Sequence, residues 1–191
     1  MRSMKLKKCS AVAALISVVL FTVHIVYEIY ASITFYYDPS LTKLLSILLI
    51  APVCVHAVLG MSIVLLMSDG TDLTQYPRQN LRTILQRISA ALFFPLLFLH
   101  VRTFEMLRSC VQSGQWAGFW MLIIAEVLFF ADILTHSAVS LTRALITMGW
   151  LSSRETQEKI DRAVYIIGFL LFMAASVTVI RMQIIIILFS H

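Results

Sequence analysis

The sequence predicts an all-helical membrane protein with five transmembrane helices. Of its 191 residues, 60% are hydrophobic and only 13% are charged, whereas charged residues make up about 25% of a typical soluble domain. Five apolar runs are each long enough to cross a bilayer as a helix, which takes about 20 residues. The apolar excess needs lipid as its solvent, which excludes a water-soluble globule, a disordered chain and a disulfide scaffold.

These runs set the expected helix boundaries and a single domain over residues 1–191. They cover residues 10–31, 44–67, 84–104, 116–139 and 164–189. The connections are short and rich in turn-forming residues, and they cover residues 37–40, 68–72, 112–115 and 152–155. No long linker, internal repeat or second soluble region interrupts the sequence, so a five-helix bundle is the expected architecture.

The first run is expected to be a retained helix rather than a cleaved signal peptide. Its basic flank, with Arg2, Lys5, Lys7 and Lys8, is typical of either. However, the apolar stretch of about 22 residues is longer than the 7–15 residues of an ordinary signal-peptide core. Aromatic residues follow it instead of a clear small-residue cleavage site.

The basic residues predict the orientation. With five crossings, the N-terminus and the second and fourth connections share one side of the membrane. That side holds Arg2, Lys5, Lys7, Lys8, Arg78, Arg82, Arg87, Arg143, Arg154, Lys159 and Arg162, and the other holds Lys43, Arg102, Arg108 and Arg181. Since basic residues favour the cytoplasmic side, the N-terminus is expected in the cytoplasm and the C-terminus outside.

Four histidines lie inside the apolar runs, one in each of the first four: His24, His56, His100 and His136. An ionisable group at membrane depth is costly, so each should face the bundle interior and have a partner. With about 1.5 Å of rise per residue, His24 and His100 share a level in the outer half. His56 and His136 lie nearer the cytoplasm, at less closely matched depths.

Two histidines that face each other across a bundle can hold one haem from its two sides. Two pairs would therefore hold two b-type haems, His24 with His100 and His56 with His136. Gly60, one turn after His56, would let a porphyrin edge approach. The simpler alternative is four core histidines bonded to nearby backbone. A zinc site is disfavoured, because it would need ligands grouped in a tetrahedron and two separated pairs do not supply one. A proton relay would not require histidines paired by depth.

Three segments resemble the membrane anchor of bacterial succinate dehydrogenases and fumarate reductases, in its single-chain, five-helix, di-haem form. They are the H-A-V-L-G segment at 56–60, the L-Q-R-I-S-A segment at 85–90 followed by His100, and His136 leading to Gly149-Trp150. The family's glycines at two of these places are Ala90 and Ser140 here. The R-x-H-S pattern common at the start of the first helix is missing.

The resemblance implies that His24 and His100 ligate the outer haem and that His56 and His136 ligate the inner one. It also implies a bacterial inner-membrane location and a flavoprotein and an iron–sulfur subunit at the cytoplasmic face. Electrons would pass between the iron–sulfur subunit and a quinone, with menaquinone favoured. No nucleotide fingerprint and no cysteine cluster is present in the sequence, so the dicarboxylate chemistry is expected in a partner. No nucleic-acid partner is expected.

Acidic residues near the predicted haems are candidates for proton chemistry. Glu28 lies one turn outward from His24 on the same face, where it could exchange protons with a quinone, and Asp38 is the competing candidate. Asp132 lies one turn from His136, where it could accept a hydrogen bond from a ligand's second ring nitrogen, relay protons or pair with a basic residue. Glu126 is expected at mid-membrane, without an evident partner.

Three arginines are candidates for binding the haem propionates by charge: Arg87 and Arg143 near the inner edge, and Arg181 in the outer part of the last run. Topology alone would also explain the first two, and an interfacial anchor would explain the third. The alternative functions are a cytochrome b subunit of a hydrogenase or formate dehydrogenase, a haem-free membrane anchor, and a transporter. The direction of catalysis does not follow from the sequence.

Overall fold

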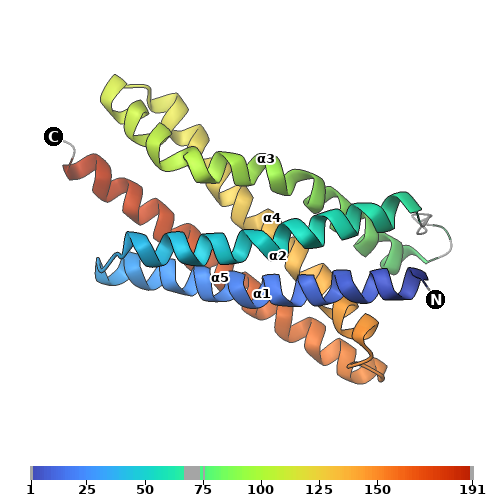
Figure 1. Cartoon of the computed structure of the whole chain (residues 1–191). Coiled ribbons are helices and arrows are strands. Elements are labelled where there is room, and N and C mark those ends of the chain that lie inside the picture. Colours follow the sequence, from blue (N-terminus) through green and yellow to red (C-terminus); the bar gives the residue numbers. More distant parts are fainter. Residues whose placement is uncertain (1, 67–73, 75, 190–191) are drawn as a thin grey trace.

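Five long α-helices make up the computed structural model, which describes residues 2–66, 74 and 76–189 (Figure 1). They are α1 (Arg2–Thr34), α2 (Pro39–Leu66), α3 (Pro77–Ser113), α4 (Trp116–Met148) and α5 (Arg154–Phe189). All five contain a stretch long and apolar enough to cross a membrane. The expected all-helical class with five membrane-length helices is therefore confirmed.

The helices are longer than the apolar runs, so the predicted boundaries are wrong at most ends. The helix predicted to stop at residue 139 continues to Met148, and the one predicted to start at residue 164 begins at Arg154. The spans of 27–34 residues are about 40–50 Å long at about 1.5 Å per residue, against about 30 Å of hydrocarbon. The predicted connection at 68–72 lies outside the described residues.

Local sequence explains where two of these helices end. Gly114 and Gly149 take left-handed conformations, with φ of 69° and 81°. After each glycine, the next amide bonds back to a carbonyl five residues earlier: Gln115 to Cys110 at 2.9 Å and Trp150 to Leu145 at 3.0 Å. This is the glycine-terminated helix end, and it lies beyond the apolar run because capping does not depend on hydropathy.

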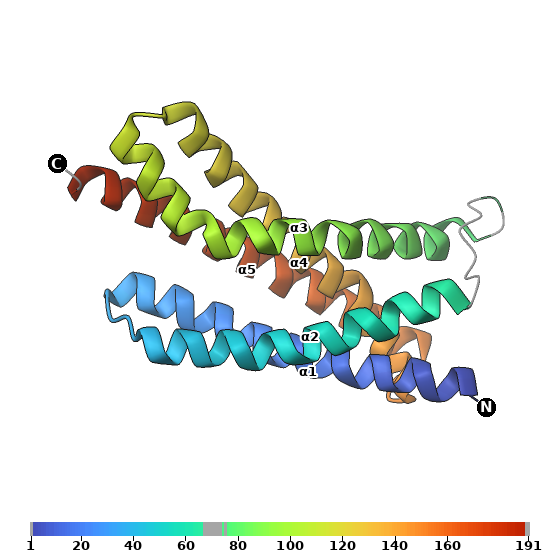
Figure 2. The same cartoon turned by 45° about the horizontal axis from the view of Figure 1, so that its top comes forward.

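The helices run back and forth along one direction, with the N-terminus and the α4–α5 connection at one end and the α1–α2 and α3–α4 connections at the other (Figures 1 and 2). α1 packs with α2, and α3 packs with α4. α4 also contacts α1 and α5, so it is the helix that joins the two pairs.

The core is small and centred on α1 and α4. One cluster joins Phe21 and Ile25 of α1 to Phe129 and Phe130 of α4 and Ala175 of α5. A second, smaller cluster joins Leu107 of α3 to Phe119, Leu122 and Ile123 of α4. Many other large apolar side chains are exposed, and the most apolar window of α2 has none of its residues buried inside the protein. Such a surface is stable only in lipid or against another apolar surface.

Candidate functional site

His56 on α2 and His136 on α4 lie next to each other, although α2 packs mainly on α1. Their ring centroids are 6.2 Å apart and their planes are inclined at 66°. Both side chains are partly buried. His56 and His136, which the sequence predicts as a pair, are thus neighbours in the structure.

Hydrogen bonds fix which ring nitrogen of His56 carries the proton. Its Nδ1 lies 3.1 Å from the backbone oxygen of Ser10 and 3.2 Å from the Ser10 hydroxyl. A carbonyl oxygen only accepts hydrogen bonds, so Nδ1 donates its proton to it. The Nε2 of the neutral ring then keeps its lone pair, which is the form that binds a metal ion.

His136 is held in the same tautomer by Ser89 on α3. The Nδ1 of His136 lies 2.9 Å from the Ser89 hydroxyl. The same hydroxyl lies 2.8 Å from the carbonyl of Leu85 and 3.2 Å from that of Gln86. When its hydrogen goes to one of these carbonyls, its oxygen accepts from Nδ1, and Nε2 again keeps its lone pair.

His100 on α3 contacts the carboxylate of Glu126 on α4. The Nδ1 of His100 lies 2.8 Å from Oε2 of Glu126, and the ring stacks on Phe129 with a centroid distance of 4.6 Å. A carboxylate only accepts, so Nδ1 of His100 is the donor. Glu126 is 4% exposed, so this pair accounts for a carboxylate buried at membrane depth.

His24 on α1 lies close enough to Glu28 and His100 to interact electrostatically with both. Its Nδ1 is buried and makes no hydrogen bond within the part of the chain that the structure describes. His24 and His100 are thus close to each other, but only His100 has its tautomer fixed by a described partner.

Asp132 does not have the partners predicted for it. The Nδ1 of His136 bonds to Ser89, so this ring nitrogen does not donate to Asp132. Among the described residues, the buried Oδ2 of Asp132 has no hydrogen-bond partner, so the expected pairing with a basic residue is also not seen. The relay role stays a prediction.

Glu28 and Asp38 both lie near the α1–α2 connection. Oε1 of Glu28 accepts a hydrogen bond from the hydroxyl of Thr42 on α2, at 2.9 Å. Asp38 caps α2: its Oδ1 accepts from the amides of Ser40 and Leu41, at 2.8 and 3.2 Å. An aspartate before a proline is a favoured helix start. Asp38 therefore has a structural role, and its proton exchange stays a prediction.

The predicted arginines have neighbours of their own. Arg143 donates to Oε1 of Gln86 at 2.9 Å and to the hydroxyl of Thr83 at 2.7 Å. The guanidinium carbon of Arg181 lies 5.2 Å from the ring centroid of Phe35. Arg87 is partly buried on α3. Propionate binding by these three residues stays a prediction.

The hydrogen bonds of Ser10 and Ser89 to their histidines were not predicted, and Glu126 was expected to have no evident partner. The signal was depth: each of them lies on a helix next to its histidine, at a similar level of the membrane. A hydroxyl or carboxylate at that level is the natural acceptor for a buried imidazole.

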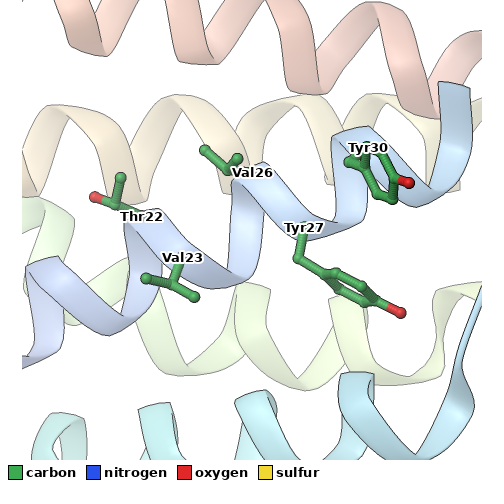
Figure 3. Close-up of a pocket in the computed structure, with 5 residues that line it drawn as sticks. All are labelled: Thr22, Val23, Val26, Tyr27 and Tyr30. Atoms are coloured by element: carbon green, nitrogen blue, oxygen red, sulfur yellow. The ribbon is translucent and has the colours of Figure 1, made fainter.

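A pocket of about 550 Å³ lies along α1 and is lined by Thr22, Val23, Val26, Tyr27 and Tyr30 (Figure 3). All five side chains come from one helix, and none is a predicted site residue. Its lining is almost wholly apolar, as expected of a hollow that faces lipid.

Within residues 2–66, 74 and 76–189, no three His, Cys, Asp or Glu side chains are grouped so that they could hold a metal ion. No protein-family model, curated protein or solved structure matches the chain.

Proposed function

We propose that the chain is the di-haem cytochrome b anchor of a bacterial succinate dehydrogenase or fumarate reductase. His56 and His136 would hold the inner haem, and His24 and His100 the outer haem. The observation that carries the proposal is the tautomer of three of these rings. His56, His100 and His136 each donate from Nδ1 to a protein oxygen, which leaves Nε2 available for iron.

The spacing of the inner pair supports two-sided ligation. Two metal–nitrogen bonds of about 2 Å, with the distance from each nitrogen to its ring centre added, put opposed imidazole centroids about 6 Å apart. The centroids of His56 and His136 are 6.2 Å apart. A methyl group built at Gly60 would meet no described atom within 4 Å, so the space beside this turn of α2 is open.

The three segments that resemble the anchor family support the choice of complex. With the N-terminus in the cytoplasm, the inner pair would lie toward a flavoprotein and an iron–sulfur subunit. A bound b-type haem supplies one-electron transfer. The aromatic and aliphatic core of α1 and α4 packs around the outer pair, where Phe129 stacks on the ring of His100.

The quinone, with menaquinone favoured, would bind at the outer end. Its reduction or oxidation moves two protons, and the carboxylate of Glu28 would exchange them there. Thr42 holds this carboxylate between α1 and α2, close to the Asp38 cap of α2. The bilayer is the inner membrane of a bacterium in this proposal.

The test measures how many haems are retained when each of the four histidines is replaced by alanine. Purified wild-type protein is expected to give a reduced-minus-oxidised b-type spectrum and two haems per chain. His56→Ala and His136→Ala should remove the same haem, and His24→Ala and His100→Ala the other. The matched control is His191→Ala, since His191 lies outside the apolar runs, and this variant should keep both haems. A wild-type protein without a b-type spectrum would refute the proposal in favour of a haem-free anchor or transporter.

A further inference from the structure

The two histidine pairs differ in the charge of the groups that hold them. At the inner level, His56 and His136 donate to neutral oxygens, the Ser10 carbonyl at 3.1 Å and the Ser89 hydroxyl at 2.9 Å. At the outer level, His100 bonds to the carboxylate of Glu126 at 2.8 Å. The outer pair therefore has an acidic partner that the inner pair lacks.

In the pair formed by Glu126 and His100, the carboxylate is buried and the imidazole is partly buried and packed against an aromatic ring. The side chain of Glu126 is 5% exposed and that of His100 is 33% exposed. Phe129, less than one turn from Glu126 on α4, stacks on the imidazole at an angle of 21°. Because the carboxylate is buried, its interaction with the ring is screened less than that of a surface pair.

A carboxylate that accepts the Nδ1 proton of a metal-bound imidazole makes the ring a better electron donor. A negative charge beside the ligand also favours the oxidised iron, which carries one more positive charge than the reduced iron. A serine hydroxyl or a backbone carbonyl orients its ring in the same way but adds no net charge.

We propose that Glu126 is a positioning residue that orients His100 and lowers the reduction potential of the haem held by the outer pair. This inference rests on the proposed function. Glu126 would then contribute to electron transfer without ligating a haem, because the reduction potential of the outer haem would depend on its charge.

The test is a redox titration of Glu126→Gln in the complete complex, with both haems followed by their absorbance. Glutamine keeps the size of the side chain and an oxygen that accepts from Nδ1, but removes the charge. We expect the reduction equilibrium of the outer haem to shift at least about tenfold toward the reduced form, which is about 59 mV for one electron. The inner haem should keep its potential, and the ferric EPR signal of the outer haem should change.

Asp132→Asn is the matched control, because Asp132 is a second acid of α4 whose Oδ2 has no hydrogen-bond partner among the described residues. It should shift the outer haem less than Glu126→Gln does. An equal shift would assign the effect to the general field of α4 and overturn the inference. An unchanged outer haem in Glu126→Gln would overturn it as well.

Loss of the outer haem in Glu126→Gln would make Glu126→Asp the deciding variant. Recovery of the haem by aspartate, at a potential within about tenfold of the wild-type equilibrium, would support the role of the carboxylate. Loss in both variants would overturn it. A wild-type protein that binds no haem overturns the proposed function itself, whereas the outcomes above leave that function standing.

Discussion

Replacing Arg82 by alanine should destabilise the end of the bundle at which α3 begins. Arg82 on α3 reaches Asp161 on α5 through two hydrogen bonds, at 2.9 and 3.0 Å. It also donates to the carbonyl of Val139 on α4, at 3.3 Å, while Thr142 donates to the same aspartate. The guanidinium of Arg82 thus joins α3, α4 and α5. Its contact on α4, at Val139, lies about one helical turn after His136.

The magnitude follows from the exposure of the pair. The side chains of Arg82 and Asp161 are 22% and 18% exposed, so water screens their charges only in part. Removal of one partner from a fully buried ion pair costs about 3–5 kcal/mol. For this partly buried pair we take the lower end, about 3 kcal/mol. In a chain of this length, that corresponds to a melting temperature lower by about 6–12 °C.

Thermal unfolding of the purified protein in detergent, followed by circular dichroism, measures this change. Arg154→Ala is the control, because Arg154 and Glu158 form an ion pair with side chains 87% and 64% exposed. Removal of such a surface pair costs at most about 0.5 kcal/mol. An Arg82→Ala variant as stable as Arg154→Ala would refute the argument that this ion pair holds the three helices together.

Three further substitutions test the acids and the tautomers. Glu28→Gln should keep both haems, since its amide oxygen still accepts from Thr42, but slow quinone turnover; unchanged turnover would leave Glu28 a purely interfacial residue. Asp132→Asn should raise the melting temperature slightly, because a neutral amide replaces a carboxylate whose buried Oδ2 has no described partner; a lower melting temperature would mean that the acid has a stabilising partner. Ser89→Ala should weaken retention of the inner haem about 10–100-fold, measured by haem transfer to an acceptor protein, and equal retention would argue against Ser89 as the group that orients His136.

Much of the fold follows from the sequence because apolar length alone decides whether a segment crosses a bilayer. The apolar runs predicted five helices, and five were found. Helix ends were less predictable, since hydropathy changes at the membrane surface while hydrogen bonding continues to a cap. The start of α5 shows this: the polar turns after Arg154 are helical, with Lys159 and Glu155 paired at 2.7 Å.

The sequence by itself determined which groups are exceptional: one histidine in each of four apolar helices, and a few acids at the same depths. Helix rise gives the depth of a residue, so the pairing of histidines by level was predictable. Only the tertiary structure decided the partners: Ser10 for His56, Ser89 for His136, Glu126 for His100, and no described partner for Oδ2 of Asp132. The reason is that a partner depends on how neighbouring helices are rotated about their axes, and that rotation is set by side-chain packing across the bundle.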